Sequence, residues 1–82
     1  MNKLLIEIHV PSIGRTFDVF IPSNGRVFEL LPLITTASIQ LSDGMFIPND
    51  VVLCDGFTGG ICDLNKSVNE MQLKNGSRLL LI

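Results

Sequence analysis

The residue types that could do chemistry are few in this chain. His9 is the only histidine, and two aspartates, Asp55 and Asp63, flank a glycine-rich stretch. We interpret His9 as a solvated residue of a strand, because it falls on the outer side of an alternating segment with no nucleophile beside it. Asp55 and Asp63 match the spacing of no cation-binding loop such as the EF-hand, and aspartate is a common turn former. The sequence therefore predicts no enzymatic activity, no catalytic residues and no cofactor.

The two cysteines, Cys54 and Cys62, are the remaining candidates for chemistry. Two cysteines are too few for a disulfide scaffold, and with one histidine in the chain they lack the ligands that a structural zinc site needs. A hairpin would place them opposite each other, so whether they pair stays open. We favour a buried pair of reduced thiols, because neither cysteine lies beside an activating cation. No metal site is predicted.

Charge is scarce in this sequence. Charged residues make up 17% of its 82 residues, against about 25% in a typical soluble domain. The six basic residues are scattered and the net charge is −2, which argues against nucleic-acid binding. No apolar run approaches the roughly 18 residues that span a bilayer, and Glu7 and His9 interrupt the apolar stretch near the start, so we expect a cytoplasmic protein without membrane insertion. A small domain with few charges exposes apolar side chains, and an exposed apolar patch usually contacts a partner.

Two strands open the predicted fold. In residues 4–10 every second position is aliphatic, and residues 17–21 repeat this alternation after a short turn. A two-residue period is typical of a strand with one buried face. The short connection between the two segments predicts an antiparallel hairpin.

A helix follows the hairpin. The apolar period changes after residue 26, which predicts a helix over about residues 26–40. Ser23 or Asn24 should cap its start. Pro32 falls inside this range, where it removes a backbone hydrogen bond, so we expect the helix to be distorted there.

The second half of the chain contains shorter elements. Strands are predicted at residues 51–54 and 61–64, on either side of a glycine-rich turn, and a last strand at residues 78–82. Between them, Ser67 and Glu70 have the spacing of a capping box, which predicts a single helical turn.

These elements predict an α+β fold. One long helix is available to cover the hairpin, so it should pack across one face of a mixed sheet of four to five strands. The length of the chain allows one domain, spanning residues 1–82. The residues expected in its core include Leu4, Ile6, Val19, Ile34, Leu73, Leu79 and Leu81.

The segment 67–81 runs from a helical turn through a buried aliphatic residue and a polar turn into an apolar strand. Together with Ile21-Pro22-Ser23-Asn24 before the helix, it resembles the ubiquitin-like β-grasp superfamily. Within that superfamily the chain is most similar to the YukD/EsaB family of bacterial type VII secretion accessory proteins, on the first strand, on Phe17-Asp18-Val19 and on residues 73–79. The resemblance implies a non-enzymatic accessory protein that binds a protein component of a secretion machine.

Conjugated ubiquitin-like proteins end in a free diglycine. Here the sequence closes with Leu80-Leu81-Ile82 inside the expected last strand. Gly59-Gly60 is internal and more simply supplies a hairpin turn. We therefore expect that this chain is not conjugated.

The outer face of the sheet is the predicted binding surface. Alternation places several apolar side chains opposite the core-facing positions. The resemblance implies that the first and last strands are neighbours, so that Leu5, Leu80 and Ile82 lie close together. It also implies that Leu53, Leu80 and Ile82 correspond by position to the hydrophobic recognition surface of ubiquitin. The predicted protein-binding patch consists of Leu5, Phe20, Leu53, Leu80 and Ile82.

Two other functions fit the same features. A homodimer or larger homo-oligomer would hide the apolar sheet face by pairing across a two-fold axis. A small β-grasp subunit of a multicomponent enzyme is the third reading, since β-grasp domains also occur in such complexes.

Overall fold

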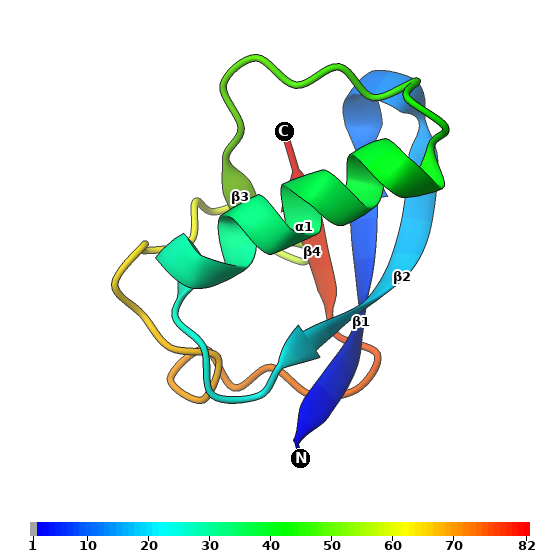
Figure 1. Cartoon of the computed structure of the whole chain (residues 1–82). Coiled ribbons are helices and arrows are strands. Elements are labelled where there is room, and N and C mark those ends of the chain that lie inside the picture. Colours follow the sequence, from blue (N-terminus) through cyan, green and yellow to red (C-terminus); the bar gives the residue numbers. More distant parts are fainter. Residues whose placement is uncertain (1) are drawn as a thin grey trace.

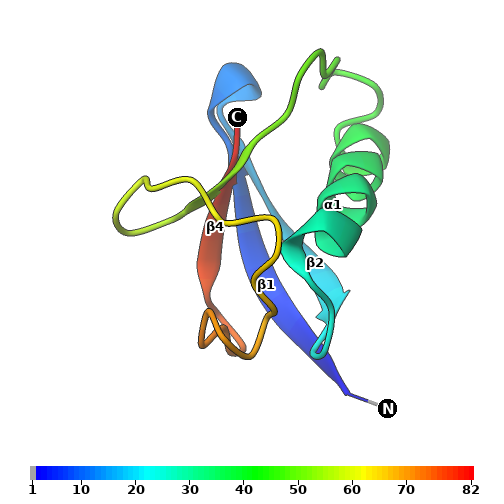
Figure 2. The ribbon, with the colours of Figure 1, turned by 90° about the vertical axis from the view of Figure 1, so that its left-hand side faces the viewer.

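The computed structural model describes residues 2–82 as four strands and one long helix. In chain order the elements are β1 (Lys3–Val10), a short 3-10 turn (Pro11–Ile13), β2 (Arg15–Pro22), α1 (Val27–Leu41), β3 (Leu53–Asp55) and β4 (Arg78–Leu81). They form one sheet in the order β2-β1-β4-β3, in which β1 and β4 are parallel and the other two pairs are antiparallel. α1 crosses one face of this sheet (Figure 1 and Figure 2). The predicted α+β arrangement is confirmed.

The β1–β2 hairpin follows directly from its alternating sequence. Ile6 pairs with Val19 and Ile8 pairs with Phe17, and all four side chains are buried against α1. The turn between the strands closes at Gly14, which has a φ of 62° and donates its N–H to the carbonyl of Pro11. Glycine adopts this left-handed conformation at no steric cost.

The start of α1 differs from the prediction. Its N-cap is Arg26, not Ser23 or Asn24. Ser23 instead extends the hairpin, since both its N–H and its hydroxyl donate to the carbonyl of Asn2. The carboxylate of Glu29 accepts the N–H of Arg26 at 3.1 Å, which satisfies one of the donors at the helix start. α1 includes Pro32 and continues past it to Leu41, close to the predicted range. The distortion expected at Pro32 stays a prediction.

The segment after β3 is not the strand expected at residues 61–64. Ile61 makes a single bridge to Cys54, and the chain then turns away from the sheet. The carbonyls of Leu64 and Lys66 accept the N–H groups of the first turn of α1, at 3.1 and 3.0 Å. A helix start leaves such donors unsatisfied, so this segment completes the helix and not the sheet.

The predicted capping box is present. The N–H of Ser67 donates to the carboxylate of Glu70, and the N–H of Glu70 donates to the hydroxyl of Ser67, both at 3.0 Å. The N–H of Met71 then donates to the carbonyl of Ser67, which closes one helical turn. This turn leads the chain back toward β4.

The core lies between α1 and the sheet. Of the residues expected there, Leu4 and Leu73 pack at its edge and are half-buried, and the other five are buried. No helix in the described part of the chain is long and apolar enough to cross a bilayer.

Candidate protein-interaction surface

The candidate surface is the sheet face that points away from α1. Its side chains come from alternate positions of each strand, so β1 contributes Leu5, Glu7 and His9. Glu7 forms an ion pair with Arg78 of β4 at 2.8 Å, close to the middle of the face. Charged groups therefore divide the apolar side chains of this surface.

The prediction that Leu5 lies close to Leu80 and Ile82 is wrong. The parallel register pairs Glu7 with Arg78 and His9 with Leu80. Leu80 lies beside His9, whereas Leu5 lies four residues before His9 in β1, on the other side of Glu7. Each residue adds roughly 3.3 Å along the strand. β4 starts late because the turn at Asn75 occupies the edge of β1 beside Leu5, where the N–H of Leu5 donates to the side chain of Asn75 at 2.8 Å.

Leu80 and Ile82 belong to an apolar group at one end of the face. The N–H and the carbonyl of Ile82 both pair with Val52, at 2.9 Å each, which brings these two side chains next to each other. Ile82 is 57% exposed and Val52 38%. Leu80 is half-buried between His9 of β1 and Cys54 of β3. We call Val52, Leu80 and Ile82 the Leu80–Ile82 cluster.

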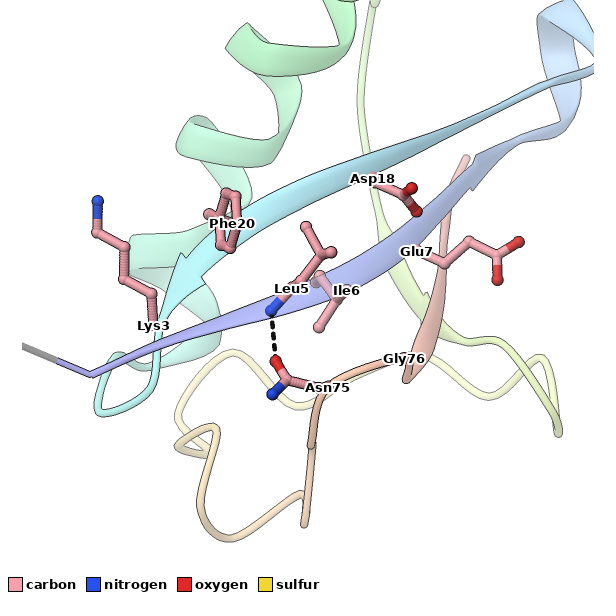
Figure 3. Close-up of a pocket in the computed structure, with 8 residues that line it drawn as sticks. All are labelled: Lys3, Leu5, Ile6, Glu7, Asp18, Phe20, Asn75 and Gly76. Atoms are coloured by element: carbon pink, nitrogen blue, oxygen red, sulfur yellow. Dashed lines mark hydrogen bonds between the residues drawn. The ribbon is translucent and has the colours of Figure 1, made fainter.

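Leu5 and Phe20 form a second apolar group at the other end. They are paired across β1 and β2, and Phe20 is 66% exposed. They line a groove of about 370 Å³ with Lys3, Glu7 and other residues of the hairpin and the 75–76 turn, as Figure 3 shows. The predicted patch is thus two separate groups.

Leu53 does not lie on this face. It is 2% exposed and pairs with Leu81, whose side chain is also in the core. The prediction assigned the alternation of this strand with the wrong parity, and a shift of one residue exchanges the two faces. Val52 takes the outward position that the sequence interpretation gave to Leu53.

The two cysteines face opposite sides of the sheet. Cys54 pairs with Ile61 and Leu80, whereas the N–H of Cys62 donates to the carbonyl of Leu53 and its side chain packs against the core. Both are free thiols. Burial raises the pKa of the Cys62 thiol, which disfavours the reactive thiolate.

A hydrogen-bonded turn beside β4 presents Phe57, which the sequence interpretation missed. Phe57 is 92% exposed. The carboxylate of Asp55 accepts the N–H groups of Phe57 and Thr58, at 2.7 and 3.0 Å. The hydrogen bond from Thr58 lowers the pKa of Asp55 most, and the hydrogen bond from Phe57 lowers it further. Figure 2 shows the segment around residues 56–60 projecting away from α1. An aromatic residue in a glycine-rich turn behind an aspartate was the available signal.

His9, on this face, and Asp63, in the segment after Ile61, each make a local hydrogen bond. The Nδ1 atom of His9 is hydrogen-bonded to the hydroxyl of Thr16 at 2.9 Å. Asp63 accepts the N–H of Asn65 and so acts as a turn former. Within residues 2–82 no three potential metal ligands come together. What the face offers is apolar contact area.

Comparison with solved structures gives matches over the whole fold. The EccD5 ubiquitin-like domain from Mycobacterium xenopi superposes with a TM-score of 0.79 at 18% identity, covering 100% of this chain and 94% of that one. The ubiquitin-like domain of the Mycobacterium tuberculosis type VII secretion system protein ECCD1 gives 0.77 at 14% identity, covering 100% and 99%. A chain of the toluene 4-monooxygenase HD complex with 4-bromobenzoate gives 0.80 at 6% identity, covering 98% and 96%.

No protein-family model and no curated protein match the sequence. At these identities the structural matches establish the fold. The EccD5 domain matches along the full length of this chain, whose four-stranded sheet is crossed by one helix. The chain has the ubiquitin-like α+β β-grasp fold.

Proposed function

We propose that this chain is a non-enzymatic protein-interaction module, and more specifically a cytoplasmic accessory component of a bacterial type VII secretion system related to the YukD/EsaB family. Residues 1–82 make up one ubiquitin-like domain in this proposal. The observation that carries it is the Leu80–Ile82 cluster, an exposed apolar surface on a face that no helix within residues 2–82 covers. Exposed apolar surface of this kind marks interaction sites.

The secretion context is supported by the likeness to the ubiquitin-like domains of EccD5 and ECCD1. Those domains share the whole fold with this chain. The partner in this proposal is a protein component of the secretion machine. It contacts Leu80, Ile82 and Val52, while Leu79 and Leu81 of the same strand pack into the core on the opposite face.

Absence of conjugation is also part of the proposal. Gly59 and Gly60 lie in the turn that Asp55 organises, and the carbonyl of Asp55 accepts the N–H of Gly59. The N–H and the carbonyl of Ile82 are both hydrogen-bonded to the backbone of Val52. Incubation of the chain with ATP and an activating enzyme should give no adenylate and no thioester by mass spectrometry.

Deletion and complementation in the organism that encodes the chain test this function. Deletion should abolish secretion of the type VII substrates, and the wild-type gene should restore it. Ile82→Asp should fail to restore it at equal protein level, because a charge replaces an apolar contact. Leu33→Asp is the matched control, since Leu33 is 53% exposed on α1 and lies outside the cluster. Normal secretion after deletion would contradict the secretion role.

A small subunit of a multicomponent oxygenase is the second candidate. The likeness to a chain of the toluene 4-monooxygenase complex, which covers almost all of both chains, favours it. In that case the chain should co-purify with oxygenase subunits encoded beside it and not with secretion components. A homodimer closing over the Leu80–Ile82 cluster would instead show a molecular mass that doubles with concentration in light scattering.

A further inference from the structure

β2 forms an edge of the sheet, and no other strand within residues 2–82 pairs with its outer side. β2 spans eight residues and stands at one end of the order β2-β1-β4-β3. In β1, Leu5 and Glu7 direct their backbone groups toward the 76–77 segment, since the carbonyl of Leu5 accepts the N–H of Gly76 and the N–H of Glu7 donates to Ser77. Their antiparallel partners, Phe20 and Asp18, must therefore point their backbone groups away from β1.

By the same alternation, the backbone N–H and carbonyl of Thr16 also point away from β1. No other residue in the described part of the chain accepts the N–H groups of Thr16, Asp18 or Phe20. An eight-residue edge with free donors and acceptors at every second residue is a template for one more strand. Such pairing gives affinity through the main chain and specificity through alternate side chains.

The charge at this edge selects the occupant. Asp18 lies directly opposite Glu7 on the outer face, as Figure 3 shows. The guanidinium of Arg78 is bonded to Glu7 at 2.8 Å. Neither ion pair within residues 2–82 includes Asp18. Like charges opposite each other destabilise a pair of strands, and an opposite charge on the next strand stabilises it.

A second copy of this chain fits the edge poorly. A two-fold pair of β2 edges that uses the free groups of Thr16, Asp18 and Phe20 most fully is centred on Asp18. It brings Asp18 of one copy opposite Asp18 of the other, which adds a further repulsion. A lysine or arginine on the added strand removes the repulsion instead. Two residues along the same face, Phe20 and its neighbour Leu5 offer an apolar contact beside the groove.

We propose that the free edge of β2 binds an extended segment of another protein as an additional strand, with a basic side chain opposite Asp18 and an apolar side chain opposite Phe20. This surface lies at the far edge of the sheet from the Leu80–Ile82 cluster, so the inference goes beyond the proposed function. Its direct readout is the set of three free amide groups, which become hydrogen-bonded when the strand is added.

The probe is a capped seven-residue peptide of threonines with a lysine at its centre and a valine two residues to each side. The matched control peptide has glutamate in place of the lysine. With isotope-labelled wild-type protein, the lysine peptide should slow amide exchange at Thr16, Asp18 and Phe20 and bind about three- to tenfold tighter than the control. Asp18→Lys should reverse that order, and Asp18→Asn should remove the preference. Ile82→Asp should bind the lysine peptide like the wild type.

Three outcomes would overturn the proposal. The first is equal affinity of the two peptides, or no binding of either at millimolar concentration. The second is slowed amide exchange confined to residues around Leu80 when the lysine peptide is added. The third is slowed exchange at the β2 edge that grows with protein concentration in the absence of peptide, which would assign the edge to a second copy. Circular dichroism confirms that each variant is folded.

Discussion

Asp55 is the residue that organises the projecting turn. It accepts N–H groups from Thr58 and Phe57, which lower its pKa. A carboxyl whose pKa is lower in the folded than in the unfolded chain stabilises the fold above the unfolded pKa. This stabilisation is lost as pH falls through the folded pKa.

Asp55→Asn therefore changes how stability depends on pH. The amide oxygen still accepts a hydrogen bond but carries no charge, so the variant should be less stable than wild type at pH 7. Its stability should also fall less steeply below about pH 4. Urea midpoints at several pH values check this. Asp50→Asn, at an exposed position outside the turn, should run parallel to wild type; a parallel curve for Asp55→Asn would show that the turn does not depend on the charge.

For single residues of the site, the sequence predicts which face of a strand a side chain occupies but not which residues of other strands lie beside it. The outward positions of Leu5, Phe20, Leu80 and Ile82 follow from alternation within their strands. The distance between Leu5 and Leu80 depends on the register of a parallel pair formed by residues about seventy positions apart in sequence, and no local pattern encodes it. For Leu53 the strand is three residues long, too short for its period to fix its face.

At the scale of elements, the close approach of the turn to β4 requires a glycine. The N–H of Gly56 donates to the carbonyl of Arg78 at 3.0 Å, and a Cβ at Gly56 would lie 2.5 Å from that carbonyl oxygen. Gly56→Ala should therefore destabilise the fold by about 1–3 kcal/mol, as overpacking does. Gly60→Ala is the control, because its nearest neighbour is the Thr58 hydroxyl at 3.3 Å. Equal urea midpoints for the two variants would show that β4 does not constrain the turn.

The hairpin and α1 depend on the packing of their facing side chains. Ile6 is fully buried in the layer between them. Ile6→Ala should cost about 2–5 kcal/mol in the free energy of unfolding, as large-to-small changes in a core do. Phe20→Ala, on the exposed side of the same hairpin, should cost much less. A denaturation midpoint unchanged by Ile6→Ala would contradict the strand register.

Elements that keep one apolar period over many residues could be predicted from the sequence. Elements whose backbone pairs with distant parts of the chain could not. The strands at β1 and β2 and the range of α1 followed from apolar periodicity. The strand expected at residues 61–64 does not form. The carbonyls of Leu64 and Lys66 instead accept hydrogen bonds from the start of α1. The same tertiary contacts moved the N-cap to Arg26, whose neighbour Gly25 accepts the N–H of Val68.

At the scale of the whole molecule, the sheet has two unlike regions on its outer face. The Leu80–Ile82 cluster is apolar and lies over β4 and the segment before β3. The β2 edge is acidic at Asp18 and has free backbone groups. Glu7 and Arg78 separate the two regions. The proposed function uses the first region and the proposed strand addition uses the second, so the two proposals place their partners on different parts of the sheet.

In the proposed function, the Leu80–Ile82 cluster binds a protein of the secretion machine. The test is calorimetric titration of wild type, Ile82→Asp and Leu33→Asp into each purified protein component of the secretion machine of the same organism, with thermal melts run in parallel. Loss of one buried apolar side chain is worth about 1.5–3 kcal/mol, so Ile82→Asp should weaken binding at least about tenfold. Leu33→Asp should bind like wild type, and all three should melt alike. Absence of wild-type binding, or wild-type affinity in Ile82→Asp, would contradict the claim.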